Sequence, residues 1–220
     1  SRIGHRRIPV QTRTYQIIRM ALRILLDNGH GKETPGKRSP VWPDGSQLFE
    51  YELNRDIVRR IARLLAHKGV AFDILVPELT DVPLYARANR ANHICSVNGA
   101  YNCLLLSIHA NAGGGTGWEV WTSRGQTAAD DYAEIFYRHA SAALPEWRMR
   151  VDTTDGDPDK ESDFTILKKT VCPAVLTENF FMDTERDCRF ILSDEGRDRI
   201  ARMHFDAILE CVEHHECKTR

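Results

Sequence analysis

Short apolar runs alternate with amphipathic segments along this chain, and that alternation constrains its fold more than any other feature. The apolar runs are each short enough to be one strand, and they lie at residues 22–26, 70–76, 102–107, 118–121, 164–167 and 173–176. The amphipathic segments carry apolar residues at helical spacing, and they lie at residues 50–67, 84–98, 127–143 and from about Ser193, which can cap the last helix. Strands that alternate with helices predict a three-layer α/β domain with a mostly parallel sheet.

The length of the chain favours one folded domain. Its 220 residues, of which 42% are hydrophobic, can fill one sizeable core, and the sequence shows no repeat, linker or second domain. We expect an N-terminal extension at residues 1–19, a single domain at residues 20–215 and a short tail at residues 216–220.

Charge and hydropathy argue against two kinds of partner. The 30 basic and 31 acidic residues nearly cancel, so the overall charge gives no reason to expect nucleic acid binding. No apolar run approaches the ~20 residues that a membrane-spanning helix needs, so we expect no membrane insertion. Residues 1–19 carry several arginines but lack the apolar stretch and the cleavage site of a secretory signal, so we expect no export signal there.

The cysteines are expected to be mostly buried, and two long polar stretches are expected to be loops. Six cysteines lie apart, without the tight spacing of a disulfide framework, and most are expected to be buried thiols. Near the C-terminus, where Cys211 and Cys217 flank two histidines, we expect a frayed, solvated tail in preference to a second metal site. The stretches at residues 31–47 and 145–162 are too rich in turn-forming and charged residues for regular structure and are expected to be loops.

Three ionisable residues come shortly after apolar runs, and these are His30, His109 and Glu178. Ligands of open α/β sheets bind outside the carboxyl ends of parallel strands, so the three side chains are expected to converge on one edge. Glu50, in the first turn of the helix after the first long loop, can reach the same edge. Two histidines and one carboxylate form a catalytic zinc set, and a further carboxylate can act as general base and acid.

Each of these residues also has a simpler interpretation when it is taken singly. A loop histidine such as His30 commonly makes surface hydrogen bonds. An acid in a first helical turn, such as Glu50, is favoured by the helix dipole, and Glu178 could be an ordinary ion-paired strand end. The conjunction of all four is what favours a metal site.

Four short motifs, in their order along the chain, carry a family resemblance. They are Leu26-Asp27-Asn28-Gly29-His30-Gly31, Glu50-Tyr51-Glu52-Leu53-Asn54, Ser107-Ile108-His109-Ala110-Asn111-Ala112 and Pro173-Ala174-Val175-Leu176-Thr177-Glu178. They resemble the zinc-dependent N-acetylmuramoyl-L-alanine amidases often called amidase type 3. A further similar stretch contains Asp81, Leu84, Arg87, Ala91 and Asn92, so the likeness extends over about residues 22–212.

This resemblance implies a fold, a site and a reaction. It implies that His30, Glu50 and His109 hold one Zn²⁺ and that Glu178 is the catalytic carboxylate. It also implies a phosphorylase- or hydrolase-like α/β domain, with a twisted central sheet flanked by helices, as the amidase catalytic domain. The expected partner is peptidoglycan, cut at the amide between the lactyl group of N-acetylmuramic acid and the L-alanine of the stem peptide.

Several positions depart from the wording of the family or lie beside its motifs. Asn28 stands where proline is typical, and Asn179-Phe180-Phe181 replaces the common ending of the last motif, so we expect an altered pocket rim. The loop at residues 145–162 is too short and polar for the blocking helix of regulated amidases, and an unblocked site is expected. Asn111 and Arg87 are candidates for contacting substrate or orienting the site.

Two tryptophans lie on the strand expected at residues 118–121. Trp118 and Trp121 alternate with other residues, so we expect both side chains on one face, either in the core or against a sugar or peptide.

Two other functions remain open on the sequence. One is a zinc carboxypeptidase-like peptidoglycan hydrolase, and the other is an inactive wall-binding relative, against which the presence of all four site residues argues. Action at the bacterial cell wall or periplasm is expected. Both a phage-type lysin, cytoplasmic until released, and a housekeeping amidase with a trimmed signal fit this expectation.

Overall fold

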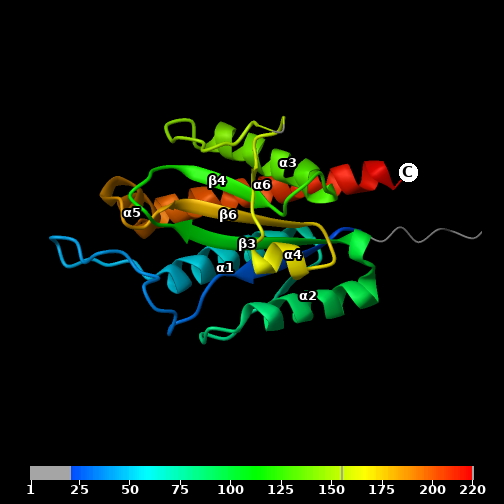
Figure 1. Ribbon diagram of the computed structural model, residues 1–220, viewed down its shortest axis with the longest axis horizontal. Helices are drawn as coiled ribbons and strands as arrows, with labels where there is room; N and C mark the ends of the chain where they lie inside the picture. Colours follow the sequence, from blue (N-terminus) through cyan, green and yellow to red (C-terminus); the bar gives the residue numbers. More distant parts are fainter. Residues whose placement is uncertain (1–20, 155, 220) are drawn as a thin grey trace, which may run out of the picture.

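Six strands form one mixed sheet in the computed structural model, which describes residues 21–154 and 156–219 (Figure 1). The strands are β1 (Arg23–Asn28), β2 (Phe72–Ile74), β3 (Cys103–Asn111), β4 (Trp118–Thr122), β5 (Lys160–Glu161) and β6 (Ala174–Phe181), in the spatial order β2-β1-β3-β6-β4-β5. Neighbours among β2, β1, β3 and β6 are parallel, whereas β4 is antiparallel to β6 and parallel to β5. The prediction of a mostly parallel sheet in an α/β fold is confirmed.

Helices cover both faces of this sheet. They are α1 (Glu50–Lys68), α2 (Leu84–Asn98), α3 (Ala128–Ala143), α4 (Thr165–Lys169), α5 (Glu185–Leu192) and α6 (Asp194–Lys218), with a 3₁₀ turn at Ala100–Asn102. Buried residues of α1, α3, α5 and α6 share one apolar cluster with one face of the sheet, and those of α2 and α4 share a second cluster with the other face. Along β3, Leu104 and Leu106 join the first cluster while Cys103 and Leu105 join the second, as strand geometry requires.

Local chemistry explains where the main helices begin and end. α1 ends because Gly69 adopts a left-handed conformation with φ of 76°, and its N–H closes the last turn. Thr127 and Asp130 form a capping box at the start of α3. The Ser193 side chain accepts a hydrogen bond from the Gly196 N–H at the start of α6, as its position in the sequence predicts.

Several boundaries differ from those expected. Residues 164–167 were expected as a strand, but residues 165–167 are the first residues of α4. The expectation was wrong because a short apolar run does not distinguish a strand from a buried helical turn. β5 interrupts the loop expected at residues 145–162, and α5 has no counterpart among the expected elements. α6 continues to Lys218 and His215 is fully buried, so the expectation of a frayed, solvated tail around the last two histidines was wrong. Predictions for residues 1–19 fall outside the described residues.

The two tryptophans of β4 do not share a face. Trp118 is fully buried in the cluster with α3 and α6, whereas Trp121 packs on the opposite face against Phe164. Residues three apart on a strand point to opposite sides, so the expectation of a common face was wrong. The expectation for the cysteines is confirmed, since five of the six are buried free thiols and only Cys217 is exposed.

None of the helices in the described parts of the chain combines the length and hydropathy that a bilayer crossing requires.

Three carboxyl groups influence one another beside the end of β4, and they belong to Asp130, Asp157 and Asp159. Asp159 is 1% exposed and accepts a hydrogen bond from Thr122 Oγ1 at 2.6 Å. Burial, together with the neighbouring Asp157 carboxyl, raises the pKa of Asp159 to about 7. The folded chain therefore holds a proton here that the unfolded chain releases at lower pH.

We predict that Asp159→Asn makes stability less dependent on pH. The ordinary pKa of this carboxyl is 3.8, so between pH 3.8 and about pH 7 the folded state binds more protons, and stability falls as the pH rises through that window. Asparagine does not ionise, so the loss of Tm between pH 5 and pH 8 should shrink by about 5–10 °C. Asp163→Asn, which alters a more exposed acid nearby, is the control, and an unchanged loss of Tm in Asp159→Asn contradicts the prediction.

Candidate active site

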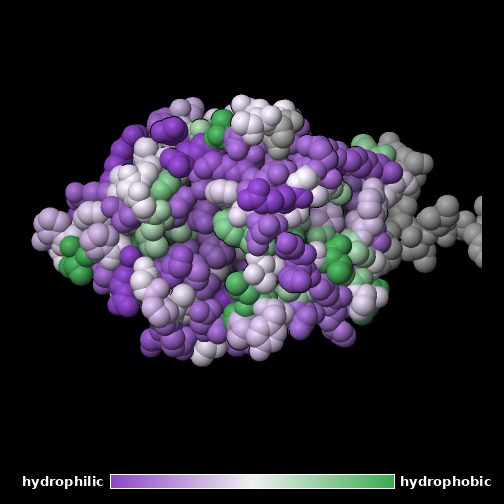
Figure 2. Space-filling model, in the orientation of Figure 1, coloured by the Kyte–Doolittle hydropathy of each residue, from purple (hydrophilic) through white to green (hydrophobic). Residues whose placement is uncertain are grey.

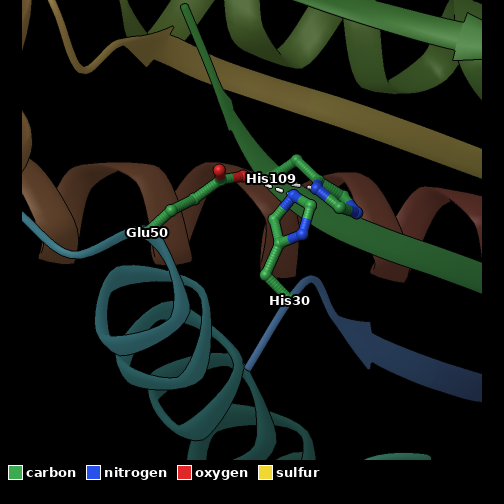
Figure 3. A group of neighbouring side chains, drawn as sticks. All are labelled: His30, Glu50 and His109. Atoms are coloured by element: carbon green, nitrogen blue, oxygen red, sulfur yellow. Dashed lines mark hydrogen bonds and ion pairs between the residues drawn. The ribbon is translucent and has the colours of Figure 1, made fainter. Parts of the chain in front are cut away.

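His30, Glu50 and His109 converge at the carboxyl ends of the parallel strands, although they come from three separate elements (Figure 3). His30 lies in the loop after β1, Glu50 is the first residue of α1, and His109 lies near the end of β3. Glu50 Oε1 lies 3.4 Å from His30 Nε2 and 3.3 Å from His109 Nδ1. One possible ligand atom from each residue lies within 4.8 Å of the others. The structure thus brings together the three residues that the sequence predicts as metal ligands.

The loop that carries His30 depends on two glycines. His30 has a φ of 61°, which is an uncommon conformation for a residue with a side chain. A Cβ atom at Gly29 would lie 2.2 Å from His109 Cε1, and one at Gly31 would lie 2.0 Å from the Asp81 backbone nitrogen. The loop can therefore pack against the His109 ring only because Gly29 lacks a side chain, and against the Asp81 backbone only because Gly31 lacks one.

Two arginines hold the same loop through its carbonyl groups. Arg55 Nη1 and Arg87 Nη2 both donate to the His30 carbonyl, at 3.0 and 3.1 Å. Arg87 Nη1 also donates to the Asn28 carbonyl at 2.7 Å and to Asp27 Oδ1 at 2.9 Å. Arg87 is 1% exposed, and its bonds lie within the protein. The nearby Asn28, in place of a typical proline, donates to the Val76 carbonyl at 3.0 Å, tying the end of β1 to the chain beyond β2.

Glu50 presents a buried carboxylate with a free oxygen. The Ala110 N–H donates to Oε1 at 3.0 Å, but Oε2 has no hydrogen-bond partner among the described residues, and Lys37 Nζ lies 3.9 Å from it. A buried carboxylate is unfavourable unless it is paired or coordinates a metal. Together with the two imidazoles, it completes the two-histidine, one-carboxylate donor set of catalytic zinc sites, so these residues could hold one metal ion.

The protonation of His30 and Glu50 suits this role, whereas His109 binds a metal only in its neutral form. Burial lowers the pKa of His30 to about 4, so its imidazole is neutral at pH 7 and has a free nitrogen lone pair. Burial opposes the ionisation of Glu50, but His109 and His30 hold the pKa of Glu50 below its usual value. Burial also disfavours the charged form of His109, yet the Glu50 and Glu178 carboxylates more than offset this and raise its pKa.

Glu178 lies directly beside this group. It pairs with His109 in the parallel register of β3 and β6, so both side chains project from the same face of the sheet. The two residues line a cavity of about 340 Å³ together with His30, Lys37, Leu84, Asp163, Phe164, Thr165, Ile166 and Leu176. Figure 2 shows that this face of the molecule is hollowed beside α4 and is largely hydrophilic there. Burial raises the pKa of Glu178 to about 7, although His109 opposes the shift.

Sequence reasoning missed a buried ionic group behind Glu178. Glu119 on β4 lies opposite Glu178 and is 3% exposed, and it accepts from Arg150 Nε at 2.7 Å and from Lys160 Nζ at 2.8 Å. Asn111 Nδ2 donates to the same carboxylate at 2.7 Å. The signal available in the sequence was the position of Glu119 between Trp118 and Trp121. A strand with large apolar side chains on both faces is buried, so an acid on it needs a partner.

Asn179 is buried rather than placed at the pocket rim. Its Nδ2 donates to the His109 carbonyl at 3.0 Å, and its Oδ1 accepts from Trp118 Nε1 at 2.9 Å. These bonds lie where the register between β3 and β6 shifts, just after His109. For this residue, the expectation of an altered rim was wrong, and the substitution supports the strand end that carries His109.

Comparison with known proteins identifies a family that this sequence matches. The family described as N-acetylmuramoyl-L-alanine amidase matches residues 24–210. The sporulation-specific N-acetylmuramoyl-L-alanine amidase of Bacillus subtilis is 30% identical over 189 residues, which are 85% of this chain and 67% of that protein. The endolysin of Bacillus phage SPP1 is 26% identical over 203 residues, covering 88% of this chain and 67% of the endolysin.

Solved structures share the fold. The N-acetylmuramoyl-L-alanine amidase from Clostridium difficile superposes with a TM-score of 0.73 at 23% identity, over 89% of this chain and 98% of that one. The enzyme of the same description from Mycobacterium smegmatis gives a TM-score of 0.70 at 22% identity, over 89% of this chain and 99% of that one.

Gly29→Ala is predicted to weaken metal binding at this site without unfolding the protein. The new Cβ would overlap the His109 ring, so His30 and His109 could not approach Glu50 together. We expect at least a ~10-fold rise in the zinc Kd, in the range that follows loss of a supporting contact at metal sites, measured by competition with a chromophoric chelator. Gly36→Ala is the control for a strained glycine-to-alanine change without a clash, since Gly36 has a φ of 73° and nothing lies within 4 Å of its added Cβ. Unchanged zinc affinity in Gly29→Ala would refute this description of the loop.

Proposed function

The chain belongs to the N-acetylmuramoyl-L-alanine amidase family, and from that premise we propose a zinc-dependent reaction. The amide that it hydrolyses joins the lactyl group of N-acetylmuramic acid to the L-alanine of the peptidoglycan stem peptide. The observation that carries the proposal is the meeting of His30, Glu50 and His109 beside Glu178 in one cavity.

In this proposal the three ligand residues and Glu178 have separate tasks. His30, Glu50 and His109 hold one zinc ion, which supplies Lewis-acid activation of the amide carbonyl and of water when it is bound. Glu178 takes up the proton of the attacking water and returns it to the leaving nitrogen of L-alanine. Its raised pKa, near 7, suits both transfers, because a group that exchanges a proton efficiently has a pKa close to the working pH.

Other charged residues act by positioning these groups. We assign Arg87 to holding the His30 loop, since it is buried and donates to the loop carbonyls. Asn111 donates to Glu119, whose ion pairs with Arg150 and Lys160 keep its carboxylate ionised beside Glu178. Polar contacts therefore support the site both at the His30 loop and beside Glu178.

We further propose that the catalytic domain spans residues 20–215 and that its site is unblocked. The sheet, the covering helices and all four site residues lie in this range, although α6 continues to Lys218. In the described parts of residues 145–162 the regular structure is β5, and no helix lies over the cavity from that loop. The proposed place of action is the bacterial cell wall or periplasm, in keeping with relatives named as a sporulation-specific amidase and an endolysin.

Glu178→Ala is expected to bind zinc normally and to lose turnover by about 10²–10⁴-fold, the usual contribution of a general acid–base group. The measurement is digestion of purified peptidoglycan, with products identified by mass spectrometry and zinc content determined in parallel. The wild type should release stem peptides that begin with L-alanine, lose this activity with a chelator and regain it with zinc. Glu52→Gln, an exposed acid on α1, serves as the control.

Other products would redirect the assignment. Trimming at peptide ends would indicate a carboxypeptidase-like hydrolase. Zinc binding without any products would favour a wall-binding relative, and an active Glu178→Ala protein would remove Glu178 from its proposed role.

A further inference from the structure

Lys37 places a cation on the wall of the catalytic cavity. Its side chain lines the same cavity as His30, His109 and Glu178 and is 40% exposed. The backbone around it is fixed, because the Glu50 N–H donates to the Lys37 carbonyl at 3.0 Å and Arg38 forms a β-bridge with Phe49. Lys37 therefore stays next to the first residue of α1.

The ammonium group of Lys37 has bonding capacity that the protein does not use. Its one ion pair with another described residue, to Glu50 Oε2, is 3.9 Å long and so too long for a hydrogen bond. By contrast, Arg55 and Arg87 are bonded to loop carbonyls, and Arg150 and Lys160 to Glu119. Among the described residues that line this cavity, Lys37 is the one lysine or arginine.

The rest of the cavity suits a short peptide with an anionic group. Leu84, Phe164 and Leu176 contribute apolar surface, which fits a small apolar side chain next to the scissile amide. Lys37 Nζ lies 3.9 Å from the carboxylate of Glu50, so the ammonium group is close to the proposed metal ligands. L-Alanine has no charged side chain, so the first residue beyond the scissile amide that can present an acidic group to Lys37 is the second residue of the stem peptide.

Resting on the proposed function, we propose that Lys37 binds a free carboxylate on the second residue of the stem peptide. Lys37 is then a specificity-determining residue, and the enzyme prefers stems in which this carboxylate is free over stems in which it is amidated. An ammonium–carboxylate hydrogen bond is charge-assisted, whereas a neutral amide in the same place forms a weaker one.

The test uses two soluble muropeptides that differ only in this group, carboxylate or carboxamide, and measures kcat/KM for each. The wild type should prefer the carboxylate by about tenfold, the lower end of the range for hydrogen bonds to charged groups, because Lys37 is partly exposed. Lys37→Met should bring the ratio close to one, and Lys37→Arg should restore part of the preference. Lys32→Met removes the same charge from an exposed position in the same loop, and it should keep the wild-type ratio.

Each other outcome overturns the inference in a recognisable way. A wild-type ratio near one, or an undiminished ratio in Lys37→Met, removes Lys37 from substrate selection. An equal loss of kcat/KM on both muropeptides in Lys37→Met places Lys37 at the reacting amide. A loss of bound zinc in the same variant makes Lys37 a support for Glu50. If the zinc-loaded wild type cleaves neither muropeptide, the proposed function itself fails.

Discussion

The carboxylate of Glu50 is buried where no hydrogen bond from the described part of the chain reaches one of its oxygens, and the arrangement of the site depends on how that charge is compensated. A buried ion must be paired or coordinated to be tolerated. Here the backbone of Ala110 supplies one hydrogen bond, and two imidazoles face the other side of the same oxygen. A divalent cation between these three groups would provide the missing compensation, so the buried charge and the donor set both suit a metal ion.

The fold delivers these groups from distant parts of the chain by fixing backbone rather than side chains. Arg87 and Arg55 bind the carbonyl of His30, and Asn179 binds the carbonyl of His109. Each of these supports donates to the main-chain carbonyl of a histidine and not to its ring, which leaves the imidazole rings free to act as ligands. The glycine at position 29 completes the arrangement, since it lets the β1 loop approach the His109 ring.

Much of this could be predicted from the sequence, because helical spacing, caps and strand-end residues are local signals. The extent of α2 and the capping of α6 by Ser193 follow from such signals, as does the meeting of His30, Glu50 and His109 at one edge. The rest depends on tertiary contacts. The start of α4 is an apolar run that also suits a strand, and the burial of Glu119 and Asn179 depends on partners far away in sequence.

X-ray absorption spectroscopy of the zinc-loaded protein tests the central claim most directly. The account predicts one zinc ion with two imidazole nitrogens at about 2.0–2.1 Å, a carboxylate oxygen at about 2.0–2.2 Å and no sulfur neighbour. It also predicts that the imidazole signal is lost when His30 and His109 are both replaced by alanine. Sulfur neighbours at about 2.3 Å, or an unchanged spectrum in that double variant, would place the zinc elsewhere and contradict the account.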